Sequence, residues 1–217
     1  MTNTDRCFDL LGKNDFDALS RLLESDPACA GARDKNGVSL LMHSLYRGRR
    51  DIAELLAVQK KTLDIFEAAA LGRLDPLRDL IRESPAALNS HSADGFTALH
   101  FACFFGQPEA ARVLIDAGGA VDAVAANPMA LMPLHSAASA RNLEAARLLL
   151  QHRAPVNARQ HGGWVPLHAA AANGDRAMVE LLLQHHADPN LANDEGKTAA
   201  MVAKDKGHNQ IAFLLEA

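Results

Sequence analysis

The chain has 217 residues, of which 48% are hydrophobic and 22% are charged, the profile of an ordinary folded protein. Its formal net charge of −4 is spread over both halves, which argues against a basic nucleic-acid-binding module or an acidic tail. The first residues, MTNTDRCFDLL, lack the basic segment and apolar core of a secretory signal, and no apolar run reaches the roughly 20 residues of a membrane span. Cys7, Cys29 and Cys103 match no metal-site spacing and favour reduced thiols. We therefore expect a cytoplasmic protein with no membrane or nucleic-acid partner.

A recurring glycine divides the chain into copies of similar length. It stands at Gly12, Gly48, Gly72, Gly106, Gly174 and Gly207, and Arg141 takes its place once. The successive steps are 36, 24, 34, 35, 33 and 33 residues. A step of the common length holds two short helical segments, with the glycine between them, and a loop. The single step of 24 residues predicts that the loop is missing near residue 61.

Three copies in the second half align closely. They read ALHFACFFGQPEAARVLIDAG (98–118), PLHSAASARNLEAARLLLQHR (133–153) and PLHAAAANGDRAMVELLLQHH (166–186). Apolar residues at i, i+3 and i+4 predict helices, and Pro133 and Pro166 stand where a helix begins. A helix pair of this size cannot bury its own apolar face, so neighbouring pairs must stack.

These recurring elements resemble the ankyrin repeat family, strongly over residues 94–217 and more weakly over 1–92. The resemblance implies an all-α solenoid of about seven helix-turn-helix units with short β-hairpin fingers and atypical N- and C-terminal caps. It implies a single domain over 1–217, with cap unit 1–33, degenerate units 34–61 and 62–92, repeats 93–126, 127–159 and 160–192, and cap unit 193–217. The uninterrupted, alanine-rich array looks like the stand-alone ankyrin proteins of bacteria.

Histidines recur at the same position of the three aligned copies, as His100, His135 and His168. Stacked helices lie about 8–10 Å apart, whereas zinc ligands must lie about 2 Å from one ion, so these histidines do not predict a metal site. The resemblance implies a structural role, in which His100 bonds Thr97 and the adjacent loop. Met132 and Val165 replace the threonine in the next two copies, so His135 and His168 are expected to bond only the loop backbone. Cys103 falls at a helix-packing position and is expected to be a buried thiol. No catalytic motif is present, so we expect no enzyme and no cofactor. An enzyme with an unrecognised site is a remote alternative.

The resemblance also implies that a partner protein binds on the concave side, through the fingertips and the exposed face of each first helix. The residues that map to this side and form our predicted binding site are Phe96, Phe104, Phe105, Met129, Leu131, His161, Trp164 and Asn173. An apolar patch of this kind on a folded protein usually marks an interaction site. The alternative is that some of these rings pack inward along the fingers.

Two other interpretations stay open at this point. The same patch could join two copies of the chain into a homo-oligomeric scaffold, so we expect a monomer or a weak homodimer. The basic residues Arg47, Arg49, Arg50, Lys60 and Lys61 could meet an anionic partner. Because Asp51 and Glu54 lie alongside them, a solvated and internally balanced face is the favoured interpretation.

Overall fold

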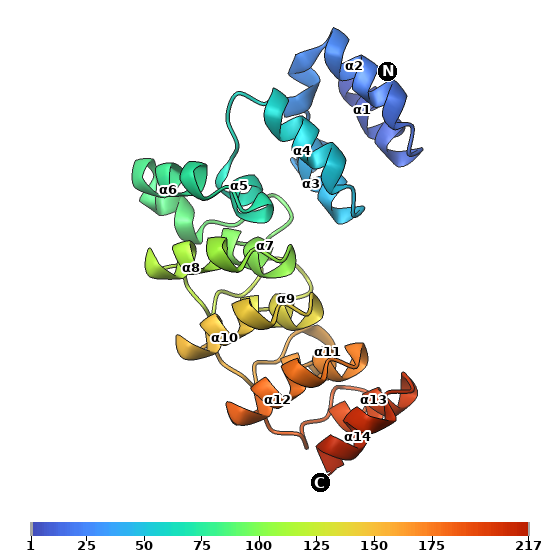
Figure 1. Ribbon diagram of the computed structural model, residues 1–217, viewed down its shortest axis with the longest axis vertical. Coiled ribbons are helices and arrows are strands. Elements are labelled where there is room, and N and C mark those ends of the chain that lie inside the picture. Colours follow the sequence, from blue (N-terminus) through green and yellow to red (C-terminus); the bar gives the residue numbers. More distant parts are fainter. Residues whose placement is uncertain (1, 217) are drawn as a thin grey trace.

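The computed structural model describes residues 2–216, which form helix pairs stacked into an elongated column (Figure 1). The first helices of the pairs are α1 (Asn3–Gly12), α3 (Leu40–Tyr46), α5 (Ile65–Leu71), α7 (Ala98–Phe104), α9 (Pro133–Ser139), α11 (Pro166–Asn173) and α13 (Ala199–Asp205). The second helices are α2 (Phe16–Ser25), α4 (Arg50–Gln59), α6 (Leu74–Glu83), α8 (Pro108–Asp116), α10 (Leu143–Gln151), α12 (Arg176–Gln184) and α14 (Asn209–Glu216). These seven pairs confirm the prediction of an all-α solenoid.

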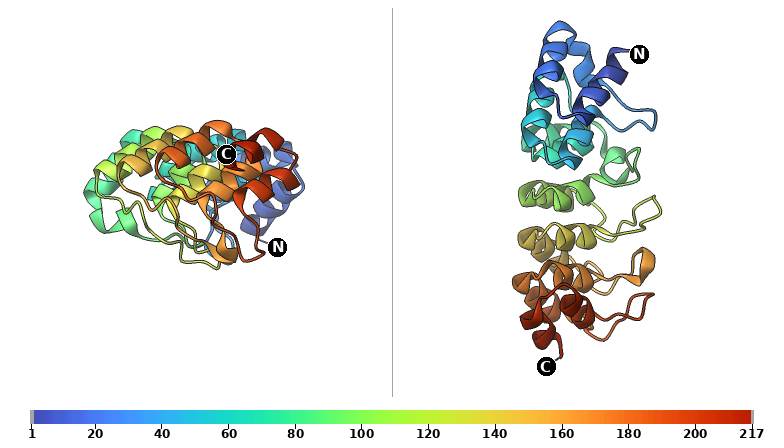
Figure 2. Two further views of the ribbon diagram at one scale, coloured as in Figure 1. Left: turned by 90° about the horizontal axis from the view of Figure 1, so that it is seen from below. Right: turned by 90° about the vertical axis from the view of Figure 1, so that its right-hand side faces the viewer.

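Loops project from one side of the column and connect most pairs to the next (Figure 2). We call them fingers and name them by their residues: 32–39, 90–97, 123–132, 157–165 and 191–198. The 3₁₀ helices η1 (Pro27–Gly31) and η2 (Pro85–Asn89) precede the first two fingers, and η3 (His161–Gly163) lies within the fourth. In the part of the chain that the structure describes, the predicted hairpin character is limited to two isolated antiparallel bridges, Arg33 with Ser39 and Ala192 with Thr198.

The turn inside each pair needs one residue in the left-handed conformation. Five of the predicted glycines adopt it, with φ between 66° and 79°. Arg141 adopts it without being glycine, at φ 57°. The prediction is wrong for Gly12, which lies inside α1, because Asn14 takes the left-handed conformation there at φ 57°. Asparagine tolerates this region better than most residues, so it ends the first turn two residues later.

The three recurring histidines join each pair to the next finger. The Nδ1 atoms of His100, His135 and His168 accept hydrogen bonds from backbone N–H groups at the start of their own helices. Each Nε2 atom therefore carries the hydrogen and donates to a backbone carbonyl of the following finger, at 3.0 to 3.1 Å. Burial lowers the pKa of all three, and that of His100 to about 4, so they are neutral near pH 7. The predicted structural role of these histidines is confirmed.

Backbone hydrogen bonds also join the fingertips to one another. The Ala126 amide donates to the Gly95 carbonyl at 2.7 Å, and the His161 amide donates to the Met129 carbonyl at 2.9 Å. The Asp194 amide repeats this contact with the Gly162 carbonyl at 2.9 Å. The last four fingers therefore form a connected row.

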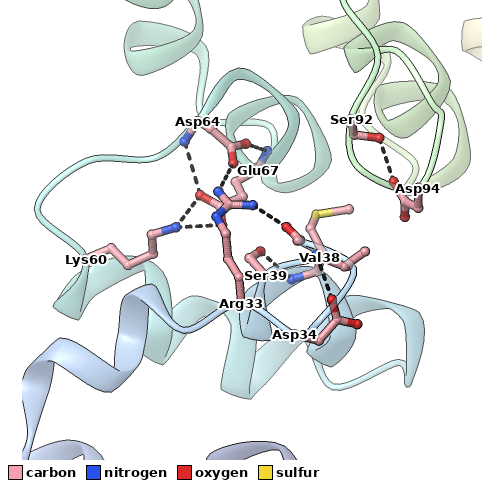
Figure 3. A network of polar contacts seen from close by, with 11 residues as sticks. Arg33, Asp34, Val38, Ser39, Lys60, Asp64, Glu67, Ser92 and Asp94 are labelled. Atoms are coloured by element: carbon pink, nitrogen blue, oxygen red, sulfur yellow. Dashed lines mark hydrogen bonds and ion pairs between the residues drawn. The ribbon is translucent and has the colours of Figure 1, made fainter.

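One finger is missing, as the short step predicts. Residues 60–64 run directly from α4 to α5 (Figure 1). Lys60 Nζ lies 2.6 Å from each carboxylate oxygen of Glu67, whose side chain is fully buried (Figure 3). Beside this pair, Arg33 Nη2 lies 2.7 Å from an Asp64 carboxylate oxygen. Ion pairs thus occupy the joint where a finger would otherwise connect two pairs.

The hydrophobic core divides at this same joint. One cluster of buried side chains is built from α1 to α4, and the other from α5 to α14. Leu71 of α5 and Phe101 of α7 belong to the first cluster and tie the two parts together. Among the described helices, none is long and apolar enough to cross a membrane.

Candidate partner-binding surface

The aromatic residues of α7 separate into an inner and an outer set. Phe101 is buried, Phe104 is 46% exposed, and Phe105 lies half-buried directly after the helix. The Phe101 ring centroid lies 5.7 Å from that of Phe96 and 6.0 Å from that of Phe66. Such spacings are those of favourable aromatic pairs. The inner rings therefore form a packed wall behind the outer surface.

Phe105 links this wall to the N-terminal helices. Its ring centroid lies 5.8 Å from Tyr46 of α3, 6.2 Å from Phe101 and 5.2 Å from Phe104. It packs against the N-terminal core cluster. Phe105 is therefore mainly a packing residue at the joint.

An apolar groove of about 360 Å³ opens in front of these rings. Its lining comprises Tyr46 of α3, Phe96, His100, Phe101 and Phe104 around α7, Met129 and Leu131 of finger 123–132, and Ser136 and Ser139 of α9. Three large side chains in it are strongly exposed: Tyr46 by 42%, Phe104 by 46% and Met129 by 49%. We call this the aromatic groove.

Tyr46 is fixed across the missing finger. Its hydroxyl donates to a carboxylate oxygen of Asp94 in finger 90–97, and the Ser92 hydroxyl donates to the other oxygen at 2.5 Å. Partial burial raises the pKa of Tyr46, and the neighbouring carboxylate adds to this effect. Helix α5, between α3 and α7, carries Ala70 and Leu71 at the positions before its turn glycine, and both are buried. Tyr46 therefore reaches over α5 to the ring of Phe105.

Finger 123–132 holds Met129 at the opposite edge of the groove. Asn127 Nδ2 donates to the Asp94 carbonyl at 2.8 Å, and Asn127 Oδ1 accepts from the Met129 amide at 3.0 Å. Pro128 stands between them, and proline restricts the backbone. The tip methionine is therefore presented on a loop that is bonded on both sides.

The remaining predicted residues lie outside the groove. Trp164 is half-buried against His168, with ring centroids 5.4 Å apart. His161 is exposed one finger further along, and its amide donates to the Met129 carbonyl. Asn173 Nδ2 donates to the last carbonyls of α9, at 3.1 and 3.2 Å, so it caps a neighbouring helix. Of the predicted set, Phe96, Phe104, Met129 and Leu131 meet in the groove, although Leu131 is buried and offers only an edge.

Sequence reasoning left Tyr46 and Phe101 out of the site. A signal for Tyr46 was available, because it precedes the turn glycine Gly48 in the same register as Phe104 precedes Gly106. The expected internal balance of the basic face is found for part of it: Arg49 pairs with Asp51 at 2.6 Å and Lys60 with Glu67, but Arg47 and Lys61 make no ion pair among residues 2–216. Arg50 and Arg73 share Glu54.

A stack of short helix pairs with fingers on one side defines a repeat solenoid, and a comparison with known families gives the particular family. The family model described as "Ankyrin repeats (many copies)" matches residues 65–115 and 134–183, which contain most of α5 to α12. The chain belongs to the ankyrin-repeat family. Ankyrin repeats are generally protein–protein interaction modules.

Proposed function

We propose that this protein is a non-catalytic recognition module that binds a partner protein on its concave side, with the aromatic groove as the centre of contact. The observation that carries the proposal is the gathering of three strongly exposed apolar side chains, Tyr46, Phe104 and Met129, in one groove. Exposed apolar surface of this kind usually marks an interaction site. Leu131 lines the groove itself, and His161, Trp164 and Asn173 then belong to a wider contact area along the neighbouring repeats.

The energetics fit a moderate complex. Burying a large apolar side chain stabilises a complex by roughly 1.5–3 kcal/mol, whereas association costs about 4–15 kcal/mol. Three groove residues alone therefore give weak binding, and a stable complex needs further polar contacts. The hydrogen bonds that hold Tyr46 and Met129 reduce the ordering cost, because both sides of the groove are fixed before a partner arrives.

The proposal places the protein in the cytoplasm as a monomer or weak homodimer. Cys7, Cys29 and Cys103 are free and buried, as expected for a reducing compartment. Burial raises the pKa of Cys103, so its thiol is a packing group and not a nucleophile.

The test compares two exposed phenylalanines. Phe104→Ala removes a groove side chain, and Phe213→Ala removes one that is 77% exposed on α14. Proteins captured by the immobilised wild type should be lost with Phe104→Ala and kept with Phe213→Ala. Capture that is equal with all three proteins would refute the groove as the site.

Light scattering at two concentrations tests the alternative of self-assembly. A wild-type dimer that Phe104→Ala converts to a monomer would make the groove a self-interface and the protein a homo-oligomeric scaffold. Wild type and variant that are both monomers at each concentration support recognition of a different protein.

A further inference from the structure

A second hollow, of about 430 Å³, lies beside the aromatic groove. Helix α3 forms the ridge between them, because Tyr46 lines the groove while His43 and Arg47 line the hollow. Arg33 and Lys35 of finger 32–39 line the hollow as well. A partner that rests on Tyr46 therefore has basic side chains on the other side of this helix.

The acidic groups in this hollow already have partners. Asp34 Oδ2 lies 2.9 Å from His43 Nε2, and Asp34 Oδ1 accepts from the Asn36 and Val38 amides at 2.8 and 2.9 Å. Asp5 Oδ2 accepts from the Thr2 amide at 2.9 Å, which closes the capping box of α1. These carboxylates are held by the fold itself.

The cations differ in how they are paired. Arg33 is bound to Asp64, but Lys35 and Arg47 make no ion pair within 4.0 Å among residues 2–216. Both side chains are exposed. Other exposed cations, such as Arg21, Arg147 and Lys206, are also without an ion pair among residues 2–216, but of the unpaired cations only Lys35 and Arg47 line this hollow.

We propose that the partner segment is an acidic one: a bulky apolar side chain enters the aromatic groove, and Asp or Glu residues of the same segment pair with Lys35 and Arg47. The inference rests on the proposed function and names the chemistry of the partner. A helix is about 10 Å across and an extended chain advances about 3.3 Å per residue. The acidic residues therefore lie about three positions from the apolar anchor.

The experiment selects binders from a display library of random 12-residue peptides, using the full-length protein as bait. The expected peptides carry Leu, Ile, Phe, Met or Trp with Asp or Glu about three positions away. An enriched peptide is then synthesised and titrated against the variants. We expect Lys35→Glu/Arg47→Glu to weaken its binding about tenfold or more, and Phe104→Ala to do the same.

The chain offers a matched control. Lys206 is exposed and precedes Gly207 in α13's turn, in the same register as Arg47 before Gly48, but it lies at the far end of the column. Lys206→Glu makes the same charge change as Lys35→Glu or Arg47→Glu alone, and unlike either of them it should alter the affinity less than about twofold. Higher salt should weaken binding to the wild type more than to Lys35→Glu/Arg47→Glu, because exposed charges are screened over about 8 Å at physiological ionic strength.

Each other outcome has a distinct meaning. Peptides that depend on Phe104 but carry no acidic residues, or bind Lys35→Glu/Arg47→Glu equally well, overturn this inference and leave the proposed function standing. Peptides whose binding ignores Phe104→Ala overturn both. If no peptide is enriched, the partner is not a linear acidic segment, and the capture experiment above decides the function separately.

Discussion

The joint between α3/α4 and α5/α6 is built differently from the joints between the later pairs. In the three joints that follow α7, α9 and α11, a neutral histidine bonds a carbonyl of the next finger and one fingertip amide bonds the preceding finger. In the earlier joint there is no finger, and the buried Lys60–Glu67 pair and the Arg33–Asp64 pair occupy its place. Ion pairs cross the regular joints only between exposed side chains, as in Arg112–Glu144 and Arg159–Asp194, whereas the irregular joint contains a buried ion pair.

The residue at the third position of the first helix differs between the regular repeats and the two pairs at the irregular joint. The third residue of each first helix is His100, His135 or His168 in the three regular repeats. The same position is Met42 in α3, which no finger follows, and Glu67 in α5. In the three regular repeats the second nitrogen of this histidine bonds a carbonyl of the next finger, whereas Glu67 of α5 pairs with Lys60 across the irregular joint. Omission of the finger also lets Tyr46 reach Asp94 and Phe105, so the irregular joint creates one wall of the aromatic groove.

The largest effect is expected from breaking the buried ion pair. Lys60→Met leaves the Glu67 carboxylate buried without a cation, and removal of one partner of such a pair costs about 3–5 kcal/mol. Urea unfolding of the wild type and the variant measures this loss. Lys60→Met/Glu67→Gln removes both charges and should recover most of it.

The matched control is an exposed pair within a regular repeat. Arg176→Ala breaks the Arg176–Glu180 pair of α12, and surface pairs contribute about 0–1 kcal/mol. If Lys60→Met is no more destabilising than Arg176→Ala, charge does not hold the irregular joint together.

A smaller loss is expected at the aromatic side of the same joint. Truncation of a buried phenylalanine costs about 3–5 kcal/mol, and Phe105 is only half-buried, so Phe105→Ala should cost about 2–3 kcal/mol. Thermal unfolding followed by circular dichroism measures it. Phe213→Ala, at a side chain 77% exposed, should change stability by less than about 0.5 kcal/mol. Equal effects of the two variants would mean that Phe105 is not part of the joint.

The regular joints should respond to acid. Burial lowers the pKa of His100 from 6.5 to about 4, so between these values the unfolded chain binds a proton that the folded chain does not. The contribution of neutral His100 to the free energy of unfolding is complete above pH 6.5 and is lost as the pH falls toward 4. The loss should reach about 2 kcal/mol near pH 5. Urea unfolding at about pH 7.5 and 5 tests this: His100→Gln should be less stable than the wild type at the higher pH and show a smaller pH dependence. An unchanged pH dependence would contradict the assignment to His100.

The regular part of this molecule could be predicted from sequence because its period is local. Glycine spacing located the turns and the missing finger, and the recurring histidines indicated the bonds to the next finger. Gly12 misled because any residue able to adopt positive φ ends the turn, and Asn14 does so. The ion pairs at the joint without a finger could not be predicted, because a missing loop does not indicate which charged side chains come into contact there.

The candidate binding site was only partly predictable for a related reason. Register alone predicted Phe104 and Met129 as contact residues, and both are exposed and line the aromatic groove. Register also predicted Asn173 as a contact residue. Its side-chain amide instead donates to the last two carbonyls of α9 and caps that helix. Tyr46 depends on a contact 48 positions away in the sequence, which follows from the short joint and not from its own repeat.

The smallest effect on stability separates the two adjacent phenylalanines. Phe104 is 46% exposed toward the groove, so Phe104→Ala should change the free energy of unfolding by less than about 0.5 kcal/mol. If it is a central contact, the same change should weaken partner binding by about 2 kcal/mol or more. Phe105→Ala should show the opposite pattern, with a larger effect on the free energy of unfolding than on partner binding. A Phe104→Ala variant as unstable as Phe105→Ala would mean that both rings serve the joint, and the groove would then lose its main exposed contact.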